Sequence, residues 1–185
     1  MAFADEPPPV DAAELVTRNP ADAVITLGDL QPAWIASLQT LELPRLGVHG
    51  NHDGEHDLPG LGIRDLHLSR AEVGGWSFAG FEGCVRYGDG PHQFTQEEAT
   101  VLACRLPPAD VLLSHCPPWG VNDEPDDPAH AGFVALREWV ERHQPRMCCT
   151  GTRRPTHARE PADLGETEVV WVRGAVPIDL KKVAA

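Results

Sequence analysis

Four short apolar runs, each of strand length and each followed by a polar residue, most constrain the fold of this chain. They lie at residues 1–4, 23–27, 46–49 and 110–114. Apolar runs of about four to eight residues without alternation are typical of strands that are covered on both faces. Such strands occur in sheets that lie between other layers, so the runs predict a layered α/β fold.

Segments with helical character separate the apolar runs. Thr95, with Glu98 three residues later, forms a capping box, which predicts a helix that continues to about Arg105. Strands that alternate with helices imply a sheet with parallel neighbours. The other expected helices span residues 11–18, 32–41 and 132–143.

Shorter elements are expected in the rest of the chain. Residues 54–75 are rich in Gly, Asp and His and should be mostly loop, with one strand at 63–68. No internal repeat or linker divides the sequence, so residues 1–185 are expected to form a single domain. Two further strands and the two strands of a closing hairpin are expected at 76–80, 146–150, 168–172 and 175–180.

Composition argues against several classes of protein. The 185 residues carry a formal net charge of -13, whereas proteins that bind a nucleic-acid duplex need clustered Lys and Arg. No apolar run approaches the ~20 residues of a membrane span, and no signal peptide is visible, so we expect a cytoplasmic protein. The five cysteines are odd in number and form no C-x-x-C pair, which indicates neither a disulfide framework nor a thiolate zinc site.

The tetrapeptide Gly50-Asn51-His52-Asp53 follows one apolar run and combines residues suited to catalysis. Glycine allows a sharp turn, and Asn51 offers a neutral oxygen that suits a divalent cation. His52 could donate a proton near neutral pH, with Asp53 holding its ring in one tautomer. The alternative is an ordinary polar turn after a strand.

Candidate metal ligands follow all four apolar runs, at Asp5, Asp29, Asn51 and His115. The ends of strands along one edge of a sheet converge in space, so these side chains should lie close together. Two carboxylates, an amide oxygen and an imidazole fit Mn²⁺, Fe²⁺ or Zn²⁺ better than Ca²⁺. Taken singly, Asp29 could equally cap a turn, and His115 could be a histidine with ordinary hydrogen-bond partners.

Three of these motifs together resemble a known family. Gly28-Asp29, Gly50-Asn51-His52-Asp53 and Ser114-His115 look like successive motifs of the calcineurin-like metallophosphoesterases, in the same order and with similar spacing. The resemblance covers nearly the whole chain. Further segments look like one bacterial subgroup of that family, at Asp5-Glu6, Arg86 to Pro91, His115 to Pro118 and His130 to Phe133.

The resemblance implies a layered calcineurin-like fold, with central β-sheets flanked by helices, and a phosphoesterase activity. Asp5 and Asp29 would bind one metal, and Asp29 would bridge to a second metal held also by Asn51 and His115. His52 would protonate the leaving oxygen of a small phosphate mono- or diester, oriented by Asp53, while a metal-bound hydroxide attacks phosphorus. The sequence does not indicate an oligomeric state.

Two motifs depart from the family pattern. Pro7 stands where the first motif has a histidine, and Gly151-Thr152-Arg153-Arg154 replaces the last Gly-His-x-His. Each metal would lose one imidazole, so only one of the two sites could be occupied unless Glu6 or His157 substitutes. Arg153 and Arg154 could instead hold the phosphate, or be solvated. The alternative function is therefore a degenerate member, weakly active or inactive, that binds a phosphorylated ligand or a protein.

A reading-frame error could also explain the altered last motif. If residues 147–152 are encoded by GC-rich codons, the same nucleotides read two positions later give Val-Leu-His-Gly-His. Our hypothesis is that a single-nucleotide deletion near Met147 shifted the frame, and that an insertion before Leu164 restored it. Sequencing the gene tests this hypothesis, because nucleotides that do not contain His-Gly-His in the shifted frame reject it.

Overall fold

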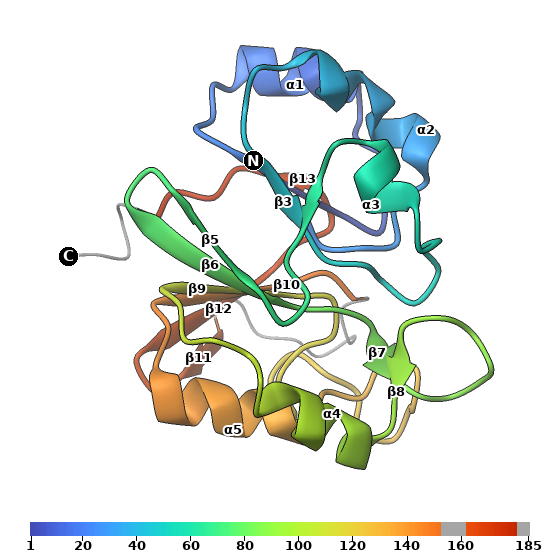
Figure 1. Ribbon diagram of the computed structural model, residues 1–185, viewed down its shortest axis with the longest axis vertical. Coiled ribbons are helices and arrows are strands. Elements are labelled where there is room, and N and C mark those ends of the chain that lie inside the picture. Colours follow the sequence, from blue (N-terminus) through green and yellow to red (C-terminus); the bar gives the residue numbers. More distant parts are fainter. Residues whose placement is uncertain (153–161, 181–185) are drawn as a thin grey trace.

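Two β-sheets lie face to face between two layers of helices in the computed structural model, which describes residues 1–152 and 162–180 (Figure 1). The first sheet has the strand order β13-β1-β2-β3-β4, and its three central strands β1, β2 and β3 run parallel. Its strands are β1 (Ala2–Ala4), β2 (Val24–Thr26), β3 (Arg45–Gly47), β4 (Arg64–Asp65) and β13 (Gly174–Val176). The helices on its outer face are α1 (Ala12–Arg18), α2 (Pro32–Ile35), the 3-10 helix η1 (Ala36–Thr40) and α3 (Asp57–Gly60).

The second sheet has the strand order β11-β12-β10-β9-β6-β5, with parallel pairing from β12 through β6. A separate parallel pair, β7 with β8, lies beside it. The strands of the second sheet are β5 (Arg70–Val73), β6 (Trp76–Phe81), β9 (Val111–Ser114), β10 (Met147–Thr150), β11 (Ala162–Leu164) and β12 (Thr167–Trp171). The remaining elements are β7 (Cys84–Val85), β8 (Gln93–Phe94), α4 (Gln96–Ala103) and α5 (Val134–His143).

Three apolar layers result from strands that are buried on both faces. In β2, Val24 packs toward the helices of the first sheet, whereas Ile25 faces the other sheet. In β9, Leu113 faces the first sheet, and Leu112 packs against α4 and α5. Because alternate residues of a strand point to opposite faces, a continuous apolar run serves two cores at once. The predicted α/β fold with parallel-rich sheets flanked by helices is therefore confirmed.

Local capping chemistry sets the helix boundaries that the sequence indicated. Thr95 accepts a hydrogen bond from the backbone of Glu98, and the Glu98 carboxylate accepts one from the Thr95 amide, so the predicted capping box is present at the start of α4. Asp11 caps α1 in the same way by accepting from the amide of Glu14. The expected helix at 32–41 lies where it was expected, but it is not one α-helix. It consists of the short α-helix α2 followed by the 3-10 helix η1.

One expectation about the strands was wrong, and another was incomplete. Residues 54–75 lie mostly outside helices and strands, as expected, but they contain α3 and β5 in addition to the expected strand. The closing hairpin does not form, because β12 joins the second sheet beside β10 and β13 joins the first sheet beside β1. In the sequence only a short turn separates β12 from β13, which is why a hairpin was expected. In the structure that turn carries the chain from the second sheet to the first. None of the helices in the described part of the chain is long and apolar enough to cross a membrane.

Candidate metal centre

Asp5 and Asp29 follow neighbouring strands of the first sheet and take left-handed backbone conformations, with φ of 59° and 54°. The amide of Asp5 donates to the carbonyl oxygen of Gly28 at 3.2 Å, which ties the two strand ends together. Gly28 has a φ of +92°, and a Cβ there would lie 2.2 Å from the amide nitrogen of Gly50. Only glycine allows this contact between the loops after β2 and β3.

His115 follows β9 in the second sheet and faces ligands from the first. Its Nδ1 lies 2.8 Å from the carbonyl oxygen of Leu27, and because that oxygen only accepts, Nδ1 carries the ring proton. In the neutral ring, Nε2 then presents its lone pair to Asn51 Oδ1 at 3.2 Å and to Asp29 Oδ2 at 3.6 Å. The amide nitrogen of Asn51 donates to the Tyr87 hydroxyl at 2.9 Å, which directs Oδ1 toward the imidazole.

Asp5 completes this group of oxygen and nitrogen donors. One ligand atom from each of Asp5, Asp29 and His115 lies within 4.8 Å of the others. Burial raises the pKa of Asp5 to about 7, with the His115 ring opposing the rise and the Asp29 charge adding to it. Oδ1 of Asp5 is buried and has no hydrogen-bond partner. Converging acceptors with an unpartnered oxygen among them are what a divalent cation would satisfy.

The donor group opens into a cleft of about 630 Å³. Four aspartates line the cleft, and no Lys or Arg does among the residues that the structure describes. An anionic ligand would be repelled by these carboxylates unless positive charge is supplied. The cleft therefore suits a cation, and an anion is expected to bind there only next to a cation that is already bound. The four aspartates are Asp5, Asp29, Asp53 and Asp57.

The side chains of His52 and Asp53 differ in their exposure and in their hydrogen-bond partners. The side chain of His52 is 70% exposed in the cleft, and its Nε2 lies 3.9 Å from Asp29 Oδ2. Asp53 is buried and accepts hydrogen bonds from the amides of Gly50 at 2.7 Å, Asp29 at 3.0 Å and Leu30 at 3.1 Å. The expectation that Asp53 orients the His52 ring is corrected, because its carboxylate is hydrogen-bonded to the backbone of both loops.

Of the two residues expected to replace the missing histidines, Glu6 and His157, the structure describes only Glu6. Glu6 forms an ion pair and hydrogen bond with Arg173. Arg153, Arg154 and His157 lie outside the described residues. Thr152 does line the cleft, and its amide donates to the His115 carbonyl oxygen at 2.8 Å. Thr152, which the motif resemblance aligns with an imidazole of the family pattern, is therefore held against the loop that carries His115.

Sequence reasoning missed several polar groups at or near the cleft. Tyr87 and His130 belong to segments that resemble the bacterial subgroup, but neither was assigned a role from the sequence. Both line the cleft, and His130 Nδ1 lies 2.6 Å from Asp127 Oδ2. A second group of potential metal ligands lies outside the cleft, and no spacing in the sequence indicates it, because its members come from three separate loops. They are His49, Glu82 and His92.

Solved structures similar to this chain cover most of its length. One crystal structure matches with a TM-score of 0.64 over 91% of this chain and 88% of its own, at 16% sequence identity. The crystal structure of TT1561 of Thermus thermophilus matches with a TM-score of 0.61 over 94% and 88%, also at 16% identity. No protein-family model and no curated protein matches the chain. At this identity the similarity shows a shared fold alone.

Proposed function

We propose that this protein is a metal-dependent phosphoesterase of the calcineurin-like type, which hydrolyses a small phosphate mono- or diester. Support comes from the motif resemblance and from the converging donors at the strand ends. Asp5 and Asp29 would hold one cation, and Asp29, Asn51 and His115 would hold a second. Mn²⁺, Fe²⁺ or Zn²⁺ suits this donor set. Two central sheets flanked by helices are also what that fold would require.

The proposal depends most on the surroundings of His115 Nε2. In the neutral imidazole, whose proton is committed to Leu27, Nε2 faces two oxygens that also only accept, at 3.2 and 3.6 Å. That arrangement is repulsive unless a cation lies among the three atoms or Nε2 takes up a second ring proton. Ligand atoms around one transition-metal ion lie about 3–3.5 Å apart; the 3.2 Å separation falls within this range, and the 3.6 Å separation lies just above it.

The side chains of this protein would divide the remaining tasks. A bound cation supplies positive charge beside the phosphoryl oxygens and acidifies water. His52 is exposed in the cleft, where its ring could give a proton to the leaving oxygen. Asp29 accepts a hydrogen bond from the His52 amide at 2.9 Å through Oδ1, while Oδ2 faces the imidazoles. Asp29 would therefore position the acid and bind metal with the same carboxylate.

A second candidate function, ligand binding without turnover, has two supporting observations. Thr152 lines the cleft where the family has an imidazole, and Glu6 is paired with Arg173 rather than with a cation. A centre with fewer ligands would hold metal less tightly, since even support residues around a metal change affinity by about 10–100-fold. A degenerate centre could then retain a phosphorylated ligand or a protein partner.

Hydrolysis of a generic aryl phosphate with added Mn²⁺ and with a chelator tests the proposal. We expect His52→Ala to lower turnover by about 10²–10⁴-fold, the usual contribution of a positioned acid, without lowering metal content. His143→Ala, which removes an exposed imidazole on α5, is the matched control. Metal-free protein without turnover would instead favour the degenerate binder. Turnover that survives both chelation and His52→Ala would contradict the proposed chemistry.

A further inference from the structure

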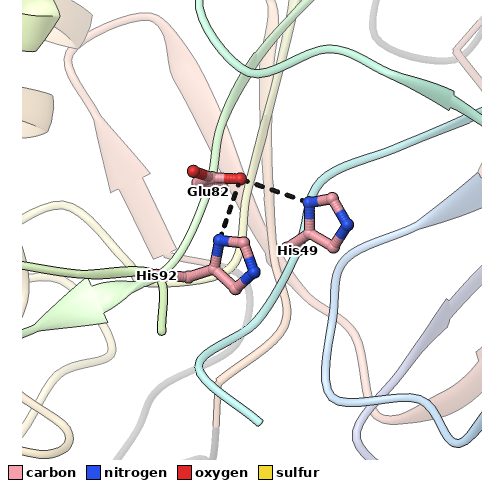
Figure 2. Close-up of side chains that lie close together, drawn as sticks. All are labelled: His49, Glu82 and His92. Atoms are coloured by element: carbon pink, nitrogen blue, oxygen red, sulfur yellow. Dashed lines mark hydrogen bonds and ion pairs between the residues drawn. The ribbon is translucent and has the colours of Figure 1, made fainter. Parts of the chain in front are cut away.

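Three loops outside the cleft bring two imidazoles and a carboxylate together (Figure 2). His49 lies two residues beyond β3, Glu82 directly follows β6, and His92 directly precedes β8. Backbone hydrogen bonds hold these loops to one another, from Gly83 to the His49 carbonyl at 2.8 Å and from Cys84 to the His92 carbonyl at 3.0 Å. The group therefore lies on a fixed framework.

We propose that His49, Glu82 and His92 form a binding site for a first-row transition-metal ion, best suited to Zn²⁺. Nδ1 of His49 lies 3.2 Å from Glu82 Oε2, and Nδ1 of His92 lies 3.3 Å from the same oxygen. Ligand atoms at the corners of a tetrahedral zinc site are about 3.3–3.5 Å apart. Two imidazoles with one carboxylate are a common zinc ligand set.

The group is also largely shielded from water. The side chain of His49 is 4% exposed and that of His92 10% exposed. The two rings lie parallel, with centroids 4.5 Å apart and planes within 1°. Nδ1 of each ring faces the same carboxylate oxygen of Glu82 (Figure 2). A buried carboxylate that faces two imidazoles favours a partner with positive charge, because buried charges are paired or coordinate metals.

Charge around the group favours a cation. Burial would raise the pKa of Glu82, but hydrogen bonds from His49 and His92 outweigh it and lower that pKa to about 2. The ligand carboxylate is therefore ionised. Asp65 Oδ2 lies 4.0 Å from His49 Nδ1 and could supply a fourth ligand, while Oδ1 of the same carboxylate accepts a hydrogen bond from the His67 amide at 2.8 Å.

His67 supports Glu82 from outside the ligand group. Its Nδ1 accepts a hydrogen bond from the Glu82 amide at 3.1 Å, so its Nε2 carries the ring proton. That Nε2 lies 3.8 Å from Glu82 Oε1, the oxygen that the other two rings do not contact. That distance is too long for a hydrogen bond, so His67 holds the backbone of Glu82 and lies near its carboxylate without orienting it.

An ion here would act structurally on the neighbouring cleft. His49 is two residues before Asn51, and a metal bond to its ring would hold the loop that carries Asn51 against the ends of β6 and β8. The inference does not depend on the proposed phosphoesterase activity, because neither Glu82 nor His92 is among the ligands proposed there.

Zn²⁺ titration of metal-free protein tests the inference. The double variant Asp5→Asn with Asp29→Asn impairs the centre in the cleft, and we expect it still to bind one equivalent of Zn²⁺. Adding Glu82→Gln or His92→Gln should weaken that binding by about 100-fold or more, because a ligand is lost. Adding His143→Gln, an exposed imidazole on α5, should leave it unchanged.

Affinity that is unchanged by His92→Gln in a folded double variant would overturn the inference. If the added substitutions prevent folding, crystals of the double variant soaked in Zn²⁺ decide the matter. Anomalous density at the zinc edge should then lie between His49, Glu82 and His92, and its absence there would overturn the inference. Loss of phosphoesterase activity alone would not, since these readouts do not use turnover.

Discussion

At the scale of single residues, Asp53 has a role that its place in the motif does not indicate. Its carboxylate accepts from three backbone amides, at Gly50, Asp29 and Leu30, and so joins the loops after β2 and β3. A carboxylate can accept several hydrogen bonds at once, which makes it suited to joining two loops. Asp53 therefore acts on the metal ligands through the backbone rather than on the His52 ring.

Asp53→Ala should lower the free energy of unfolding by about 3 kcal/mol, because it leaves backbone amides in a buried place without acceptors. Urea denaturation monitored by circular dichroism measures this change. Asp22→Ala, at an exposed aspartate, is the control and should change stability by less than about 0.5 kcal/mol. If Asp53→Ala instead keeps full stability and only slows turnover, the orienting role expected from the sequence would be the correct one.

At the scale of elements, Ser77 and Asp110 fasten β6 to β9 near the start of both strands. The amide and the hydroxyl of Ser77 donate to Asp110 Oδ2 at 2.9 and 2.6 Å, and the Asp110 amide donates to the Ser77 hydroxyl at 2.9 Å. These side-chain and backbone hydrogen bonds from Ser77 lower the pKa of Asp110 below its usual value. The contact thus depends on pH.

Asp110→Ala should destabilise the protein by about 1.5–3 kcal/mol near neutral pH, the usual value for hydrogen bonds to a charged group. Because the folded pKa of Asp110 lies below the unfolded one, its stabilisation is present above the unfolded pKa and is lost as pH falls through the folded pKa. The cost of the substitution should therefore shrink at about pH 3. Urea denaturation at both pH values measures it, and an equal cost at both would contradict this assignment.

The elements that could be predicted from sequence are those with a local cause. The strands β2, β3 and β9 were expected because uninterrupted apolar runs need cover on both faces, and α4 because Thr95 and Glu98 cap it. Strand partners have no local cause, which is why the expected hairpin between β12 and β13 was wrong. The sequence also could not indicate that His115 comes from a different sheet than Asp5 and Asp29.

Side-chain groups assembled from distant loops were the hardest part to predict. Asp5, Asp29, Asn51 and His115 could be predicted as one group because each follows a strand, and the ends of parallel strands meet. His49 and Glu82 also follow strands, but these strands belong to different sheets, and His92 precedes a strand rather than following one. Their proximity depends on tertiary packing, which one sequence without its fold does not reveal.

At the scale of the whole molecule, the net charge and the lining of the cleft both favour a cation, rather than an anion, as the first ligand to bind. The chain carries a formal net charge of -13, and the ends of both sheets meet at a cleft lined by four aspartates. A protein of this charge attracts cations over several ångströms and repels free anions. Binding of phosphate without a cation in the cleft is therefore not expected from the described residues.

Anomalous diffraction from crystals soaked in Mn²⁺ tests the central claim most directly, because it locates the ion without relying on turnover. The account predicts a peak within about 2.0–2.3 Å of Asp29 Oδ2, Asn51 Oδ1 and His115 Nε2, the usual length of such metal bonds. Crystals of Asp29→Asn should lose most of that peak. A soaked wild-type crystal with no density among these three atoms, or with manganese bound only elsewhere, would contradict the account.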